Sequence, residues 1–101
     1  MGKVTVIGTF TCQDGKADEM DAVLAKMVEA ARDEPGAEIY SYHRGDANTY
    51  WFFALMADAE SMQNHGQSEA MQAAMEAFGP LVAEPPQISM TIPVAALGLD
   101  L

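Results

Sequence analysis

Hydrophobic and polar positions along the chain predict four β-strands. Residues 3–12 are rich in β-branched and aromatic side chains, which favour a pleated, half-buried strand. Two aromatic-rich segments at 37–44 and 48–57 are separated by the short Gly-Asp-Ala sequence at 45–47, which predicts a β-hairpin. A fourth strand is predicted at 87–94, where apolar and polar residues alternate after two prolines.

Between these strands the periodicity changes to that of amphipathic helices. In residues 16–33 the apolar positions recur at three- and four-residue steps: Met20, Val23, Leu24, Met27, Val28 and Ala31. The Glu-Pro-Gly sequence at 34–36 ends this helix, because proline disfavours helical geometry in the residue before it. Asp58 is a predicted N-cap for a short helix that ends near His65, and Ser68 is a predicted N-cap for another that runs to Phe78.

The predicted order β-α-β-β-α-β indicates an α+β, ferredoxin-like fold with an antiparallel sheet and helices on one face. The third strand carries apolar side chains on both faces: Tyr50, Phe52, Ala54 and Met56 on one, Trp51, Phe53 and Leu55 on the other. Because two helices can cover only one face, we predict a homodimer that packs sheet against sheet. The apolar tail at 95–101 is predicted to dock on the partner subunit.

Composition and charge narrow the class of protein. The 101 residues are 50% apolar, which is enough for one core, and we predict a single domain over 1–101. With a formal net charge of −10, the chain is a poor partner for nucleic acids and for anionic membranes. No apolar run reaches the roughly 20 residues of a membrane helix, and the N-terminus lacks a signal-peptide pattern. We therefore predict a cytoplasmic protein.

Cysteine, histidine and acidic residues give few options for metal chemistry. Cys12 is the single cysteine, so it is interpreted as a small buried hydrophobic residue. The two histidines lie on different predicted elements, and no metal is expected. Acidic residues in and after the first helix are interpreted as a solvent-exposed helix face: Asp18, Glu19, Asp21, Glu29, Asp33 and Glu34.

Several short sequences together resemble the antibiotic biosynthesis monooxygenase family of dimeric α+β barrels. They are Pro35-Gly36, Tyr40, the aromatic third strand, Ala59-Glu60-Ser61-Met62, His65, Ser68 and Leu81. The resemblance implies a small pocket between sheet and helices in each subunit. It also implies oxidation of quinols, anthrones or related phenols by O₂ without metal or flavin. Because the family includes haem-degrading enzymes and isomerases as well, membership by itself does not select one activity.

The sequence departs from the family pattern at the third strand. Many relatives carry Glu and Trp there, at places that correspond to Ala54 and Met56. Haem-degrading relatives also use an Asn in the first strand, at a place near Gly8. Of their functional residues only His65 is present, so haem degradation is not expected. Trp51 does not replace the missing Trp, because an odd offset along a strand points it to the opposite face.

His65 is the candidate catalytic residue, since an imidazole exchanges protons near neutral pH. The alternative is a helix C-cap or packing residue, and Ser68 is interpreted as an N-cap. Tyr40 and Tyr42 share one strand face and could direct phenols into the pocket, or could be core tyrosines with hydroxyls at its rim. His43 lies on the opposite face, which favours an interface or surface role. The remaining substrate-binding candidates are ordinary core residues or a ligand wall: Phe52, Met56, Met75 and Phe78.

Together these patterns and the family resemblance predict a cofactor-independent monooxygenase that oxidises a small quinol- or anthrone-like aromatic with O₂. No cofactor is expected, because the substrate anion supplies the electrons. Two alternatives stay open. One is an isomerase or other proton-transfer enzyme in the same pocket, although the scarcity of cations fits phosphorylated substrates poorly. The other is a non-catalytic dimeric binding protein for a hydrophobic metabolite.

Overall fold

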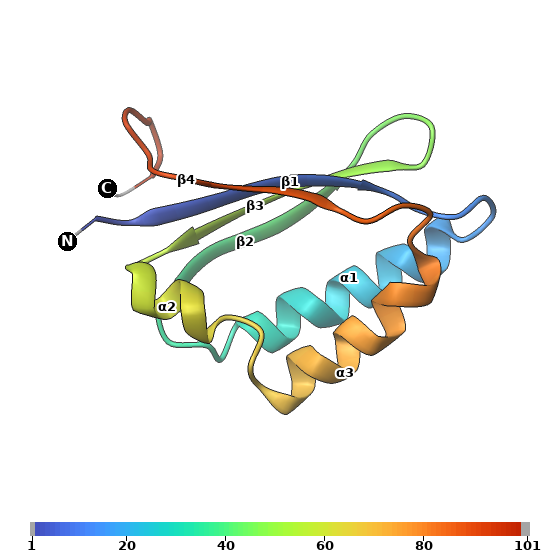
Figure 1. Ribbon diagram of the computed structural model, residues 1–101, viewed down its shortest axis with the longest axis horizontal. Helices are drawn as coiled ribbons and strands as arrows, with labels where there is room; N and C mark the ends of the chain where they lie inside the picture. The colour runs from blue at the N-terminus through green and yellow to red at the C-terminus, as the bar shows by residue number, and fades with distance from the viewer. Residues whose placement is uncertain (1, 100–101) are drawn as a thin grey trace.

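The computed structural model describes residues 2–99. It consists of an antiparallel sheet covered on one face by helices (Figure 1). The elements in chain order are β1 (Val4–Thr11), α1 (Ala17–Ala31), β2 (Ala37–Arg44), β3 (Thr49–Met56), α2 (Ala59–Asn64), α3 (Glu69–Phe78), a 3-10 turn (Gly79–Leu81) and β4 (Gln87–Thr91). This arrangement confirms the predicted ferredoxin-like α+β fold. The fourth strand is shorter than predicted, because Pro93 has no backbone N–H to extend the ladder.

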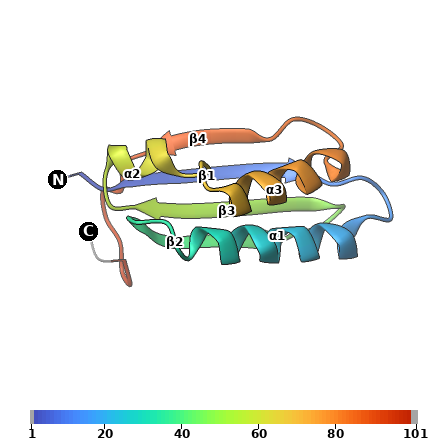
Figure 2. The same cartoon turned by 90° about the horizontal axis from the view of Figure 1, so that it is seen from below.

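The strand order β2-β3-β1-β4 places β1 and β3 in the middle of the sheet, and α1 and α3 lie over one face, roughly aligned with the strands (Figure 2). Register sets which side chains meet the helices. Gly8 pairs with Phe52, and Phe10 pairs with Tyr50. Tyr42, on β2, also pairs with Phe52. Because alternate residues of a strand point to opposite faces, one aromatic row from three strands faces the helices.

Helix α1 supplies most of the helical part of the core. Its stripe Met20, Leu24, Met27 and Ala31 is buried, as its spacing predicts. These side chains pack with Phe10, Tyr50 and the buried face of α3 in the larger of two core clusters. Cys12 is 1% exposed in that cluster, and burial raises the pKa of its thiol. This confirms its interpretation as a buried apolar residue.

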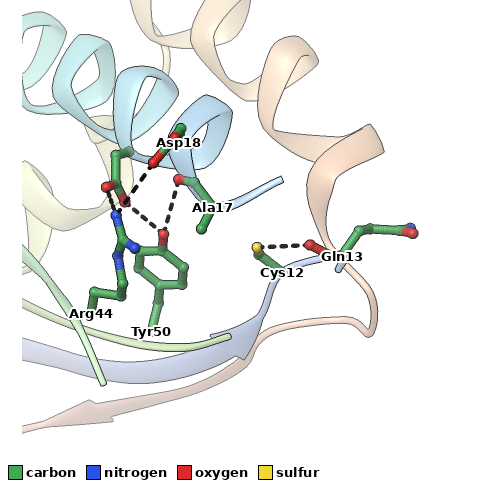
Figure 3. A network of polar contacts seen from close by, with 7 residues as sticks. Cys12, Gln13, Ala17, Asp18, Arg44 and Tyr50 are labelled. Carbon is green, nitrogen blue, oxygen red and sulfur yellow. Dashed lines mark hydrogen bonds and ion pairs between the residues drawn. The ribbon is translucent and has the colours of Figure 1, made fainter. Parts of the chain in front are cut away.

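A polar network fastens the start of α1 to the sheet (Figure 3). The Tyr50 hydroxyl donates to Asp21 Oδ1 at 2.6 Å and to the Ala17 carbonyl at 3.2 Å, and Arg44 forms an ion pair with Asp21. The hydrogen bond from Tyr50, together with Arg44, lowers the pKa of Asp21. Burial, followed by the bond to Asp21, raises the pKa of Tyr50. Asp21 is thus a structural acceptor as well as a member of the half-exposed helix face.

The sheet face opposite the helices remains partly open in the single chain. Trp51 is 52% exposed and Ile7 is 46% exposed on this face, whereas Leu55 is buried. The segment after β4 returns over the same face (Figures 1 and 2), with Val94 and Leu97 exposed to solvent. Residues 100–101 of the predicted docking tail lie outside the described residues. The homodimer and the docking of the tail stay predictions.

Within residues 2–99, every helix is too short or too polar to cross a lipid bilayer.

Candidate functional site

A cavity of about 310 Å³ lies between the sheet and the helices. Its lining comes from every layer of the fold: Val6, Phe10, Tyr40, Tyr42, Phe52, Ala54 and Ile88 from the sheet, Met27 from α1, Met71, Met75 and Phe78 from α3, and Met62, His65, Gly66 and Pro86 from α2 and the connections. The volume falls at the lower end of the range usual for small-molecule sites. The cavity can hold a ligand of one or a few rings.

The structure brings most of the predicted site residues to this cavity. His65, Tyr40, Tyr42 and Phe52 line it. Met75 and Phe78 line it from α3. Met56 does not: it is fully buried at the end of β3, next to Val6 and Ala54, which do line the cavity. Strand alternation put Met56 on the cavity side, but the cavity ends before it. The roles of these residues stay predictions.

Two tyrosines on β2 supply hydroxyl groups to the wall. The Tyr40 and Tyr42 oxygens are 2.6 Å apart, and the rings meet edge to face at 5.2 Å. Burial raises the pKa of both phenols, with a further contribution at Tyr42 from the neighbouring Tyr40. Both therefore remain neutral near pH 7. Because one of the two hydroxyls donates to the other, the pair has one O–H left to donate to a ligand oxygen.

His65 is held by a carboxylate that the sequence did not identify. Its Nδ1 lies 2.6 Å from Glu34 Oε1, and the Gly66 N–H donates to Glu34 Oε2 at 3.2 Å. The side chain of Glu34 is only 11% exposed. The interpretation of Glu34 as part of a solvent-exposed helix face is therefore wrong.

Two local structures place Glu34 beside His65. Beyond α1, the Glu34 N–H donates to the Ala31 carbonyl at 3.0 Å, and a turn follows in which Gly36 has φ +86°. On the other side, α2 begins at the Asp58 cap, whose side chain accepts from the Ser61 N–H at 2.8 Å. His65 is the C-cap of α2, as one of its two interpretations predicted, and it also lines the cavity. Ser68 caps α3 through the Met71 N–H, as predicted.

A signal for Glu34 was present in the sequence. The buried stripe of α1 continues at three- and four-residue steps through Leu24, Met27 and Ala31, and Glu34 lies three residues further on. A carboxylate that continues a buried stripe needs a partner, because an unpaired charge is costly to bury. Its partner is 31 positions away in the chain, so no local pattern could name it.

The cavity is apolar apart from the imidazole and the two phenols. Among the described residues, none of its lining side chains is a lysine, arginine, aspartate or glutamate. Clusters of three or more His, Cys, Asp or Glu side chains able to hold a metal are likewise absent from residues 2–99. The walls therefore favour a flat, largely apolar ligand that carries a hydroxyl or other weakly acidic group.

Comparison with known proteins gives a consistent result. The model of the antibiotic biosynthesis monooxygenase family matches residues 3–77. A crystal structure of a candidate antibiotic biosynthesis monooxygenase from Caulobacter crescentus is 28% identical, with a TM-score of 0.86 over 93% of this chain and 92% of that one. A variant of SnoaB, a cofactor-independent oxygenase from Streptomyces nogalater, is 19% identical, with a TM-score of 0.83 over 98% of this chain and 100% of that one. At that identity the likeness concerns the fold alone.

An uncharacterized protein of Synechocystis is also similar, at 25% identity over 86% of this chain. The matched region spans 60% of that relative's length.

Proposed function

The chain belongs to the antibiotic biosynthesis monooxygenase family, and from this premise we propose that it is a cofactor-independent monooxygenase that oxidises a small quinol- or anthrone-like aromatic with O₂. One observation carries the proposal: an imidazole and two neutral phenols are the polar side chains of an otherwise apolar cavity. That set suits a substrate that must lose one weakly acidic proton in a dry site.

The chemistry balances without an added reductant. For an anthrone-like substrate, His65 takes a proton from the acidic carbon or its enol, and the resulting anion transfers electrons to O₂. One oxygen atom becomes the new carbonyl of the product, and the other leaves as water with the two hydrogens of the substrate carbon. The chain's own contribution is to accept and return the proton at His65 and to donate a hydrogen bond to the substrate oxygen from Tyr40 or Tyr42.

Oxygen uptake tests this proposal directly. Metal-free protein supplied with a panel of hydroquinones and anthrones is expected to consume O₂ well above a no-protein autoxidation control. Catalase added at the end should release no O₂, because the second oxygen atom leaves as water rather than as peroxide. Uptake no faster than the control across the panel, or peroxide as the stoichiometric product, would contradict a monooxygenase.

A binding protein for a hydrophobic metabolite is the second candidate. The observation that favours it is that Ala54 and Met56 occupy the places where many relatives carry Glu and Trp. Such a protein would bind aromatic ligands in the cavity, detectable by calorimetry, with no conversion of the ligand under O₂. Product formation under O₂ separates the two candidates.

We also propose that the chain acts as a homodimer through the open sheet face, where Trp51 and Ile7 are half exposed. Sedimentation is expected to give twice the chain mass of 10.8 kDa. Trp51→Glu should shift the protein to the monomer, because it places a charge within the apolar interface. Gln72→Glu on α3 adds the same charge at an exposed site elsewhere and should leave the dimer intact. A wild-type monomer, or a Trp51→Glu dimer, would rule out this interface.

A further inference from the structure

Both carboxylate oxygens of Glu34 contact residues that line the cavity, namely His65 and Gly66. Oε2 accepts the Gly66 N–H at 3.2 Å, and Oε1 lies 2.6 Å from His65 Nδ1. The backbone N–H can only donate, and an ionised carboxylate can only accept. As long as Glu34 is a carboxylate, the hydrogen on the 2.6 Å contact comes from Nδ1 of the imidazole.

The second ring nitrogen of His65, Nε2, makes no hydrogen bond to the side chains and backbone that the structure describes. Within residues 2–99, every buried side-chain nitrogen or oxygen does have a partner, so Nε2 is not a buried atom. Nε2 therefore retains accessible surface, on a side chain that lines the cavity. Tyr40 stands edge-on to the imidazole at 5.0 Å and 85°, which restricts ring rotation.

From this geometry we propose that Glu34 is a positioning residue that holds the proton of neutral His65 on Nδ1 and so presents the Nε2 lone pair to the substrate. The hydrogen bond made by one ring nitrogen determines which nitrogen carries the proton. With Nε2 unprotonated, the imidazole is a base toward the cavity; with the proton on Nε2, it is only a donor. The inference rests on the proposed function for its catalytic meaning, but the tautomer itself does not.

Glu34→Gln tests the proposal because glutamine keeps the size of the side chain and loses one acceptor. The amide carbonyl oxygen of this variant can accept from the Gly66 N–H or from His65, but one oxygen cannot replace the two that now serve both donors. The backbone N–H of Gly66 can only donate, whereas the imidazole can carry its proton on either ring nitrogen. The amide NH₂ of the variant should then donate to Nδ1 and drive the proton of His65 to Nε2.

Nitrogen-15 NMR of the histidine rings measures this tautomer without any substrate. With the pH raised until the ring signals stop changing, so that the ring is singly protonated, wild-type His65 is expected as the Nδ1–H tautomer and Glu34→Gln as the Nε2–H tautomer. His43, the other histidine of the chain, is exposed and bonded to Ser41, so its ring signals should not change. Glu29→Gln, an exposed position on α1, removes one charge without touching His65 and should keep the wild-type tautomer.

Activity supplies an independent second measurement. Glu34→Gln should lower kcat for oxygen-dependent turnover by about 10- to 100-fold, the range found when the partner that orients a metal-bound imidazole is removed, with KM nearly unchanged. A merely structural role would change KM and leave the tautomer as it was.

Each result decides the proposal. A singly protonated His65 that carries its proton on Nε2 in the wild type overturns it, and this measurement needs no variant to fold. An Nδ1–H tautomer that persists in Glu34→Gln overturns it too, because the carboxylate would not be setting the proton. If the tautomers behave as expected and no substrate is turned over, the positioning of His65 stands and the proposed monooxygenase fails.

Discussion

Replacing His65 by glutamine is expected to lower kcat by about 100- to 10,000-fold, the range over which a positioned base contributes to proton transfer. This corresponds to about 3 to 5 kcal/mol of activation free energy. Glutamine has an N–H that can still donate to Glu34 Oε1, so the buried carboxylate keeps a partner and the fold is expected to survive. The amide cannot accept a proton from the substrate, and this is the reason for the loss.

The measurement is oxygen uptake with the best substrate of the panel, compared with circular dichroism to verify folding. His43→Gln is the matched control, because His43 lies on the sheet face away from the cavity and is exposed. Turnover by the control should equal that of the wild type. Full turnover by His65→Gln would keep the activity and remove the proposed role of the imidazole.

Gly36→Ala is expected to reduce the free energy of unfolding by about 2 to 5 kcal/mol, the largest loss of stability that we predict. Gly36 has φ +86°, where an L-residue costs about 1 to 2 kcal/mol. A Cβ at this position would also overlap the Ser61 hydroxyl and lie 2.6 Å from Ser61 Cβ, and relieving such a clash costs about 1 to 3 kcal/mol. The Ala57 N–H bonds to the Gly36 carbonyl at 2.8 Å, so the turn cannot move freely away.

Denaturant unfolding gives this free energy, and Gly15→Ala separates its two contributions. Gly15 has φ +76°, but nothing beyond the glycine and its two chain neighbours lies within 4 Å of the place that a Cβ would occupy, so its substitution introduces backbone strain without a clash. Gly36→Ala should lose more stability than Gly15→Ala. Equal losses would show that α2 moves away from the new Cβ without loss of stability. The clash with Ser61 would then contribute nothing to the change in the free energy of unfolding.

The same substitution connects stability to the site. Gly36 lies in the turn that carries Glu34, and Ser61 belongs to the helix whose C-cap is His65. Moving this turn away from α2 separates the carboxylate from the imidazole. The Nδ1–H tautomer of His65 should therefore be lost in folded Gly36→Ala, together with turnover.

Much of the candidate site followed from strand alternation. Tyr40 and Tyr42 are two residues apart on β2, so their shared face was certain once the strand was recognised, and the structure places both at the cavity. The same rule put Met56 with Ala54, but alternation says nothing about where a cavity ends along a strand. Met56 is consequently core and not wall.

Long-range partners were beyond the sequence for a different reason. Periodicity reports which face of an element is buried, not which residue of another element it meets. Glu34 and Asp21 were both assigned to one exposed acidic face, yet Asp21 accepts from Tyr50 on β3 and Glu34 contacts His65 after α2. Each pairing spans about thirty residues of chain, and it exists because turns bring the two elements together.

The sequence by itself determined the order of strands and helices, their capping residues and the face that each buries, because these depend on local propensity and on periods of two and 3.6 residues. Tertiary structure alone decided that the cavity stops short of Met56 and that Glu34 lies beside His65. Such facts depend on how far apart packed elements sit and on which donor must satisfy a buried carboxylate, and a linear pattern contains neither distance nor partner.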